Sequence, residues 1–414
     1  MTIISSENRV WVRISNSCIS SCIFCLDSDN LKQKSFVEDK IIKYELEKSY
    51  KKGYKNKAII SGGEASINPK FIDYIKYARD VGYTKIQTIT NGYKFGSESF
   101  TKKCIDNGLD EITFSLHGHT PELHDSLTGL KGAFKNIIKA IYYIRNNHPE
   151  TIINCDIIIC KPNVGYAYKI VQLLKRLQVF EYDILQIVPQ ALAWENRGDL
   201  LFDDIYNHKE SLHKLWKESE DKRVHMRANR VFPGLLEGFE DMIQSPEKMS
   251  DEVLNEAKKE WERVFKKRKL PECRDEIRCA NCYMNWFCDN LNEFYFSSNK
   301  KNKKEKLFSH RSIDKINEIY PADIVNFKGE VFGRDVLNLP YCLSGKNNSF
   351  TNFNDYLLEH KIQANIVNFT NWFMDEGFRI KSTGCKECKL YNSCKGIHIN
   401  FIKKYGFKIL NPIK

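Results

Sequence analysis

Short apolar runs alternate with amphipathic stretches over the first half of the 414-residue chain. The amphipathic stretches repeat apolar residues at spacings of three and four, which predicts helices, whereas the short apolar runs predict strands. The expected helices span 38–52, 69–81, 134–146 and 166–179, and the expected strands span 10–14, 58–61, 86–90, 112–115, 152–160 and 184–188. Alternation of this kind indicates parallel strands joined by right-handed helical crossovers.

The strand runs are apolar on both faces, as parallel strands covered by helices should be. The sequence therefore predicts an α/β fold, a partial (β/α)6 TIM-like barrel, with a mostly α, cysteine-rich C-terminal extension. In such a barrel the chemistry lies at the carboxyl ends of the strands. We expect the barrel in residues 1–195, a helical linker region in 196–270 and the cysteine-rich region in 271–414. That last region includes a lysine-rich linker at 297–306 and a short β-like segment at 324–337.

Composition narrows the class of protein. The net charge of +11 is compatible with a nucleic-acid binder. The lysines are scattered, however, and their dense cluster at 297–306 lacks interleaved aromatic residues, so we expect a solvated surface and no nucleic-acid partner. The chain has no apolar run long enough for a membrane span and no signal-peptide pattern. We therefore expect a cytoplasmic protein with no membrane partner.

Cysteine is the most informative residue type. Eleven of the 14 cysteines fall into tight spacings. A cytoplasmic chain does not normally keep structural disulfides, so clustered cysteines indicate metal binding or catalysis. The other three, Cys104, Cys155 and Cys160, lie in predicted regular elements, where we expect them to be small core residues.

Three cysteines with C-x3-C-x2-C spacing directly follow the first predicted strand: Cys18, Cys22 and Cys25. Three protein ligands on a four-iron cluster leave one iron open, which a catalytic centre needs and a closed structural site lacks. The alternative is a zinc knuckle with a distant fourth ligand. Zinc sites usually pair two C-x2-C units, and this loop does not.

Small and polar residues follow the next strands. Gly62 and Gly63 allow a close backbone approach to a ligand, and Glu64 places an acceptor where a ligand ammonium group would bind. Thr90 and Asn91 end the third strand. Each motif alone is compatible with an ordinary turn. Their shared position at strand ends favours a functional interpretation, because those ends meet at one edge of the barrel.

The triad, with Phe24 directly before its last cysteine and Gly-Gly-Glu after the second strand, resembles the radical S-adenosylmethionine (SAM) superfamily. The resemblance implies a [4Fe–4S] cluster on Cys18, Cys22 and Cys25, with SAM bound to its fourth iron. It also implies that Gly62, Gly63 and Glu64 receive the SAM amino group. The polar wall near the ribose would then comprise Thr90 and Asn91, and Ser115, at the end of the fourth strand, would contact SAM.

The sequence departs from this family at one position and carries a histidine group that the family does not need. Some relatives hold the SAM carboxylate with an arginine about a dozen residues after the fourth strand; here Thr128 stands in the comparable stretch, so the carboxylate partner is unassigned. Three histidines on the same loop, His117, His119 and His124, suggest a metal site, but their spacing fixes no geometry for one ion.

Two further cysteine sets follow. The first cysteine set is Cys273, Cys279, Cys282 and Cys288, and the second is Cys342, Cys385, Cys388 and Cys394. Both contain C-x2-C-x5-C, a spacing that suits zinc and iron equally. The resemblance to the SPASM or twitch extension of radical SAM enzymes favours two auxiliary [4Fe–4S] clusters. SPASM domains usually carry one more cysteine where this chain has His398, which we expect to be an ordinary surface or core residue.

The resemblance implies an enzyme that cleaves SAM reductively to a 5′-deoxyadenosyl radical and abstracts hydrogen from a substrate. Enzymes with this extension often modify peptides or proteins, so a peptide is the leading substrate, and a small molecule in cofactor or natural-product biosynthesis is the alternative. The first strand begins within about ten residues of the start, so we expect no N-terminal peptide-recognition domain. A reductant such as flavodoxin or ferredoxin is the implied partner, and no catalytic side chain is assigned.

Two alternatives of other classes are open. An iron–sulfur electron carrier without enzymatic activity would explain the clustered cysteines but not Gly-Gly-Glu and the other strand-end residues. A zinc-bearing nucleic-acid binder would explain the charge and the C-x2-C pairs but not a barrel.

Overall fold

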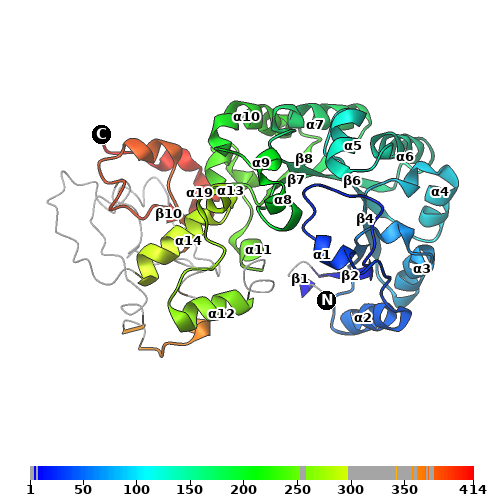
Figure 1. Ribbon diagram of the computed structural model, residues 1–414, viewed down its shortest axis with the longest axis horizontal. Coiled ribbons are helices and arrows are strands. Elements are labelled where there is room, and N and C mark those ends of the chain that lie inside the picture. The colour runs from blue at the N-terminus through cyan, green and yellow to red at the C-terminus, as the bar shows by residue number, and fades with distance from the viewer. Residues whose placement is uncertain are drawn as a thin grey trace. The chain divides into compact units, whose positions relative to one another are not determined.

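The computed structural model describes residues 4–5, 8–251, 258–296, 342, 357–358, 361–369, 372 and 377–414. The chain forms two compact units, Met1–Asn229 and Arg230–Lys414, which we describe separately (Figure 1). The sequence suggests boundaries near residues 195 and 271 instead. The difference arises because one further strand, β8 (His225–Asn229), joins the sheet of the first unit after the predicted barrel ends.

The first unit is built on an eight-stranded sheet whose strands follow chain order. The edge strand β1 is antiparallel to β2, and β2 to β8 are parallel throughout. Within the described residues β2 does not pair with β8, so the barrel is open. The strands are β1 (Ile4–Ser5), β2 (Arg9–Ser15), β3 (Lys57–Gly62), β4 (Lys85–Thr90), β5 (Glu111–Ser115), β6 (Ile152–Ile159), β7 (Glu181–Gln186) and β8. The predicted α/β class and open, barrel-type parallel sheet are confirmed.

Helices follow nearly every strand (Figure 1). They are α1 (Ser28–Leu31), α2 (Asp39–Lys51), α3 (Phe71–Val81), α4 (Glu98–Asp106), α5 (Pro121–Thr128), α6 (Ala133–Asn147), α7 (Ala167–Arg176), α8 (Ala191–Glu195), α9 (Arg197–Leu200) and α10 (Lys209–Lys217). Apolar side chains at helical spacing drive this packing: Ile137, Ile141 and Ile144 of α6 are fully buried. The buried Cys104, Cys155 and Cys160 confirm their predicted place in the core.

The strands bury one side more completely than the other. In β6 every second residue is buried and the residues between them are half-exposed. Those between face the barrel interior and are partly polar: Glu111 of β5 accepts hydrogen bonds from Lys57 of β3 and Asn154 of β6, both at 2.6 Å. These hydrogen bonds join β6 to the amino ends of β3 and β5, at which Lys57 and Glu111 are the first residues.

The second unit has shorter elements. Its helices are α11 (Pro246–Asp251), α12 (Lys258–Lys267), α13 (Glu276–Asn281), α14 (Asn285–Leu291) and α19 (Ile399–Tyr405), and its two-stranded sheet pairs β9 (Arg379–Ile380) with β10 (Ile397–His398). The mostly helical extension is confirmed as a class. The expected helical linker region also contains β8 and two 3₁₀ turns, η6 (Pro233–Leu236) and η7 (Glu240–Met242). The lysine-rich linker and the β-like segment lie outside the described residues.

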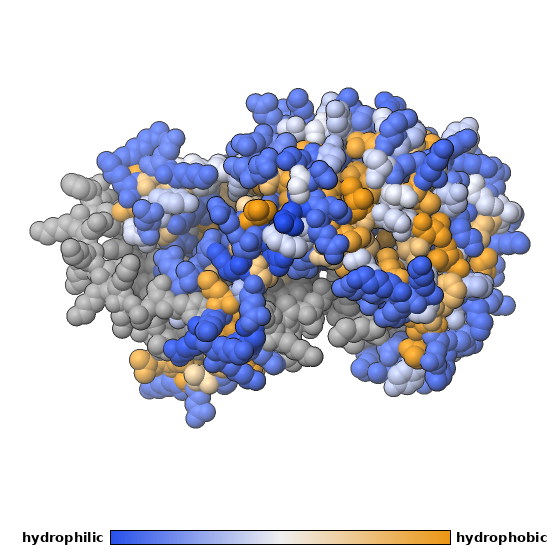
Figure 2. Space-filling model, in the orientation of Figure 1, coloured by the Kyte–Doolittle hydropathy of each residue, from blue (hydrophilic) through white to orange (hydrophobic). Residues whose placement is uncertain are grey.

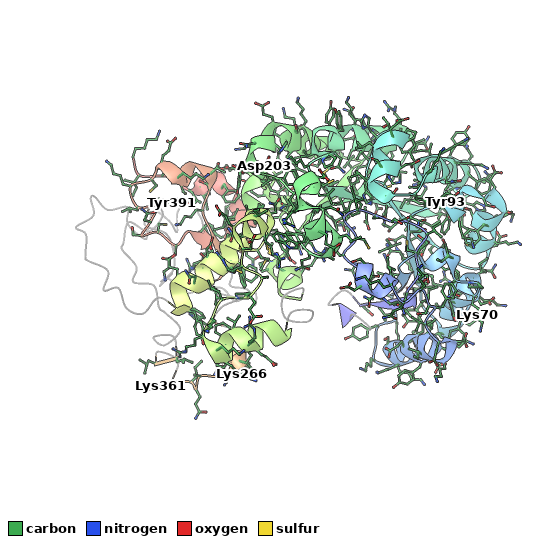
Figure 3. The ribbon with its side chains drawn as sticks, in the orientation of Figure 1. Lys70, Tyr93, Asp203, Lys266, Lys361 and Tyr391 are labelled. Carbon is green, nitrogen blue, oxygen red and sulfur yellow. The ribbon has the colours of Figure 1, made fainter. Side chains whose placement is uncertain are left out.

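Hydrophilic residues spread over the described surface of both units rather than forming one block (Figure 2). Several long polar side chains extend outward, among them the labelled Lys70 and Lys266 (Figure 3). Lys70 and Lys266 therefore lie on solvated faces, and the absence of a nucleic-acid partner stays an expectation. Across the described part of the chain, no helix combines the length and apolarity that crossing a bilayer requires.

Candidate active site

The cysteine triad lies on the loop of residues 16–27, here called the cysteine loop, which leaves the carboxyl end of β2. Cys18, Cys22 and Cys25 are all half-buried. Burial, and then the neighbouring Cys18 and Cys25, raises the pKa of the Cys22 thiol to about 12. The three sulfurs therefore share one low-polarity place, where their thiolate forms need a positive centre such as iron.

Side chains from the sheet hold the cysteine loop at both ends. Arg13 of β2 donates two hydrogen bonds to the Asp27 carboxylate, both at 2.9 Å, and so fixes the end of the loop. Asn91, just beyond β4, donates from Nδ2 to Ser20 Oγ at 2.9 Å and lies 4.0 Å from Cys18 Sγ. The loop is thus positioned by a folded scaffold.

Two helices hold the middle of the same loop through the backbone. The carbonyl groups of Leu127 and Thr128 at the end of α5 accept from the N–H groups of Ile23 and Ser21, at 3.1 and 2.9 Å. After α8, Asn196 donates from Nδ2 to the Ile23 carbonyl oxygen at 2.9 Å. Thr128, in the stretch where some relatives carry an arginine, thus contributes a backbone contact to the cysteine loop.

The two glycines after β3 are required by packing against this loop. A Cβ atom on Gly62 would lie 2.4 Å from the Ser15 carbonyl oxygen, and one on Gly63 would lie 2.5 Å from that of Ser17. Gly62 also has a φ of +147°, which disfavours other residues. The Glu64 N–H donates to the Ser17 carbonyl oxygen at 2.8 Å. Gly-Gly-Glu and the cysteine loop therefore form one packed unit.

Glu64 is buried, and its carboxylate is almost fully used. Oε1 accepts from the Ser66 N–H at 3.0 Å and from Thr90 Oγ at 2.8 Å, and Oε2 accepts from the Asn91 N–H at 2.7 Å. A carboxylate offers about four lone-pair sites, so about one remains on Oε2 for a further donor.

Thr90 and Asn91 thus have an observed role that sequence reasoning missed. Their hydrogen bonds support Glu64 and the cysteine loop, and Asn91 Oδ1 also accepts from the Tyr93 N–H at 3.1 Å. An Asn-Gly turn after a strand gives no sign of these tertiary contacts. The Arg13–Asp27 pair was also missed, although the alternation along β2 places Arg13 on the interior side.

Ser115 ends β5 and is half-exposed, in register with Asp156 of β6. Phe24 is buried, with its ring edge-on to the His117 ring at a centroid distance of 5.0 Å. Phe24 therefore anchors the cysteine loop to the turn after β5.

The three histidines do not share a site. The His124 Nδ1 accepts from the His117 N–H at 3.1 Å, the His117 Nδ1 accepts from the Ile158 N–H at 3.2 Å, and His119 stacks on Tyr166. Burial lowers the pKa of His117 to about 3 and that of His124 to about 4. Both are therefore neutral packing residues that join β5, β6 and α5.

The first cysteine set of the second unit surrounds α13 and α14. Burial, and then the neighbouring Cys273 and Cys279, raises the pKa of Cys282 to about 11. Burial and the nearby Cys282 raise that of Cys288 to about 12. The four cysteines therefore lie close enough to interact electrostatically.

The second cysteine set is also brought together. Burial raises the pKa of Cys342 to about 11, and Cys394, Cys385 and Cys388 add to the shift. Backbone N–H groups point at these sulfurs: Gly396 donates to Cys394 Sγ and Ile413 donates to Cys388 Sγ, both at 3.3 Å.

His398 is a helix cap. Its Nδ1 accepts from the Asn400 N–H at 3.1 Å at the start of α19. The geometry of the sulfurs bears on the choice between iron and zinc. Over the described residues, no three Cys, His, Asp or Glu side chains are arranged to hold a single metal ion. A cubane differs from such an ion because each thiolate binds a different iron.

Comparison with known protein families identifies one domain of this chain. Residues 12–174, which contain the cysteine loop and Glu64, match the family model described as the radical SAM superfamily. The chain carries a radical SAM superfamily domain. That domain implies a [4Fe–4S] cluster and SAM as cofactors, and the relatives that match this chain are enzymes.

The relatives that match this chain are distant. The chain is 23% identical over 232 residues to a protein named probable GTP 3′,8-cyclase from Saccharolobus islandicus, covering 54% of this chain and 71% of that one. It is 26% identical over 172 residues to an AdoMet-dependent heme synthase from Methanosarcina barkeri, covering 41% of this chain and 46% of the relative.

A solved structure of Streptococcus suis SuiB bound to precursor peptide SuiA aligns with 59% of this chain and 56% of its own length. The TM-score is 0.43 and the identity 14%. The chain thus spans just over half the length of that structure.

Proposed function

We propose that this chain is a radical SAM enzyme that binds its [4Fe–4S] cluster through Cys18, Cys22 and Cys25 and holds SAM beside it against Glu64. The observation that carries the proposal is that the packed Gly62–Glu64 turn and the cysteine loop meet at the carboxyl end of β3. When bound, the cluster supplies the electron that splits SAM into methionine and the radical that starts the reaction.

The chain's own residues bind SAM, orient it and shield it from water. Glu64 accepts a hydrogen bond from the SAM ammonium group with its remaining lone pair, because its other acceptor sites are occupied internally. Asn91 keeps Ser20 and Cys18 in register with that carboxylate. Phe24 and His117 close the side of the loop that faces β5 and β6, which keeps water from this side.

We propose a peptide or protein as the substrate. The support is the pair of four-cysteine sets in the second unit, whose spacing resembles the SPASM extension and whose thiols are gathered within each set. The two cysteine sets would hold auxiliary clusters, which would supply a binding site for the substrate or an acceptor for its electron. The reaction is then an oxidation or cross-linking of a side chain, with flavodoxin or ferredoxin as the reductant.

A small-molecule substrate is the second candidate, and the names of the relatives favour it. The GTP 3′,8-cyclase and the heme synthase both act on small molecules, and the former matches 54% of this chain. The two candidates share the site in the first unit and differ only in what enters the barrel.

The test is anaerobic reconstitution with iron and sulfide, followed by reduction with dithionite and assay of 5′-deoxyadenosine. Cys22→Ala should lower its formation about 100-fold or more, because the cluster loses one of three ligands. Glu64→Gln should raise the KM for SAM about 10-fold through loss of one charge-assisted hydrogen bond.

The matched control is Cys104→Ala, a buried cysteine outside the clusters, which should retain activity. Unchanged 5′-deoxyadenosine formation in Cys22→Ala would overturn the proposal. If the iron-loaded wild type forms no 5′-deoxyadenosine, the result would favour an iron–sulfur electron carrier. Consumption of added GTP would decide for the small-molecule candidate.

A further inference from the structure

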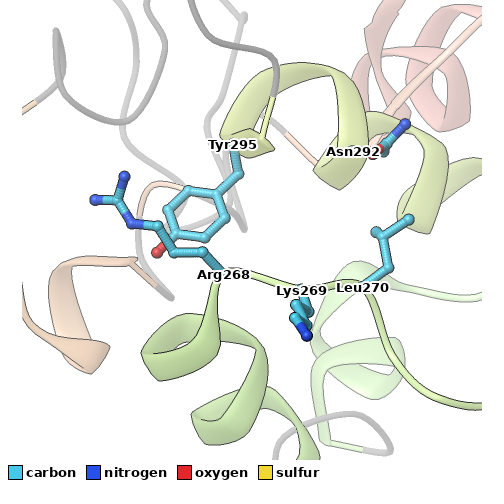
Figure 4. Close-up of a pocket in the computed structure, with 5 residues that line it drawn as sticks. All are labelled: Arg268, Lys269, Leu270, Asn292 and Tyr295. Carbon is cyan, nitrogen blue, oxygen red and sulfur yellow. The ribbon is translucent and has the colours of Figure 1, made fainter.

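The second unit contains a cavity of about 440 Å³ at the end of α12. The lining residues come from two segments, the turn after α12 and the helical turn η9 (Asn292–Phe296), as Figure 4 shows. They are Arg268, Lys269, Leu270, Asn292 and Tyr295. This volume is in the range of sites for small ligands or a few side chains, and none of the chemistry proposed above uses it.

The cationic group in this cavity is held in place. The Arg268 guanidinium lies over the Tyr295 ring, 5.5 Å from its centroid (Figure 4). The Tyr295 hydroxyl donates to the Phe265 carbonyl oxygen at 3.1 Å, which fixes the ring. Neither Arg268 nor Lys269 forms an ion pair with any described residue. An ordered guanidinium on an aromatic face with no acidic partner is suited to receive an anion.

The backbone conformation at Arg268 indicates that its side chain has a functional role. Its φ is +50°, and its N–H donates to the Val264 carbonyl oxygen at 2.9 Å, so it occupies the left-handed position that closes α12. Glycine or asparagine is preferred there, because other side chains are strained in this conformation. The helix dipole accounts for basic residues in the last turn, such as Lys266 and Lys267, but not for arginine in this conformation.

The facing segment is also irregular. Asn292 and Tyr295 come from a π-helical turn, a rare conformation that is frequent at functional sites. Two unusual backbone segments therefore meet at one cavity, and both contribute the polar groups that line it.

We infer that this cavity binds a carboxylate of the peptide substrate, with Arg268 and Lys269 as its cationic partners and Leu270 and Tyr295 packing on the adjoining methylene groups. The inference rests on the proposed function, because it assumes a peptide. An acidic side chain held here would fix the peptide beside the segment that leads to Cys273 of the first cysteine set. The substrate class is then a peptide with glutamate or aspartate near the modified residue.

The experiment uses the iron-loaded full chain and three probes: fluorescein-labelled Gly-Glu-Glu-Glu-Gly, its lysine counterpart, and inorganic phosphate as competitor. Fluorescence anisotropy should show binding of the glutamate peptide alone. Arg268→Gly should weaken this binding about 10-fold or more. The same variant should unfold at the same or a higher temperature, because glycine relieves the strain at the helix end. Loss of binding would then not reflect loss of folding.

Two more variants keep the test decisive. Lys269→Gln should also weaken binding of the glutamate peptide, whereas Lys266→Gln, which removes an exposed charge outside the cavity, should change it by less than about twofold. Equal affinity in wild type and Arg268→Gly overturns the inference. Phosphate binding without glutamate-peptide binding also overturns it, because the site is then not for a peptide carboxylate.

The assay of 5′-deoxyadenosine on the same samples separates the two proposals. Arg268→Gly should retain SAM cleavage in the absence of peptide. If the wild type binds the glutamate peptide but never cleaves SAM, the cavity is supported and the proposed function fails. If SAM is cleaved and no variant affects peptide binding, the proposed function stands and the cavity inference fails.

Discussion

The cysteines of the two units are held in different ways. The cysteine loop of the first unit is fixed from outside by β2, by α5 and by the residues that follow β4 and α8. The cysteine sets of the second unit lie among short helices and a sheet of two residues per strand. The difference suggests that the first unit folds and then receives its metal, whereas in the second unit metal binding contributes to folding.

Removal of metal should give the largest difference between the two units. With an iron chelator under anaerobic conditions, limited proteolysis should cut residues 271–296 and 377–414 about tenfold faster, because metal-binding energy is lost where the core is small. Residues 8–229 should remain protected, since their sheet is intact. Mass spectrometry of the fragments checks this.

Equal protection of both units with and without metal would contradict the proposed contrast. A Cys22→Ala variant serves as the control, because it should lose the cluster of the first unit without changing the cleavage pattern there.

This contrast also explains which features the sequence could predict. The six strands of the barrel were predicted because each contains an apolar run, and β7 (Glu181–Gln186) was displaced toward its carboxyl end because that end is the more apolar. The strand β8 was missed because His225 and Arg227 alternate with only two apolar residues. Its pairing is decided by the neighbouring strand, which no local pattern records.

The candidate site was predictable to a similar degree. Gly62, Gly63 and Glu64 were found through spacing, since a strand end restricts what can follow it. The supporting contacts of Asn91 and Asn196 were not, because each bridges segments far apart in sequence. Residues that act through tertiary contacts carry no local signal.

Acid should destabilise the first unit in particular, through its buried histidines. The folded pKa values of His117 and His124, about 3 and about 4, lie below the ordinary value of 6.5. The unfolded chain therefore binds more protons below pH 6.5, and stability falls as the pH falls. From pH 6.5 to pH 5 each histidine should remove about 2 kcal/mol from the free energy of unfolding.

Urea unfolding at pH 7 and pH 5, followed by far-ultraviolet circular dichroism, measures this loss. His124→Gln should roughly halve the pH dependence attributed to the pair, whereas His225→Gln, at an exposed position of β8, should leave it unchanged. A wild type equally stable at both pH values would show that these histidines are not buried in the neutral form.

A smaller effect, confined to the second unit, is expected from one backbone hydrogen bond. The Ile413 N–H donates to Cys388 Sγ at 3.3 Å, while the Ile413 carbonyl oxygen accepts from the Lys389 N–H at 2.8 Å. Ile413→Pro removes only the donor to sulfur, and Ile413→Ala keeps it. The proline variant should lose about 1 kcal/mol of stability and shift the potential of the proposed cluster downward, because hydrogen bonds to sulfur stabilise its reduced state. Redox titration followed by electron paramagnetic resonance compares the two variants, and identical potentials would show that this N–H does not reach a cluster thiolate.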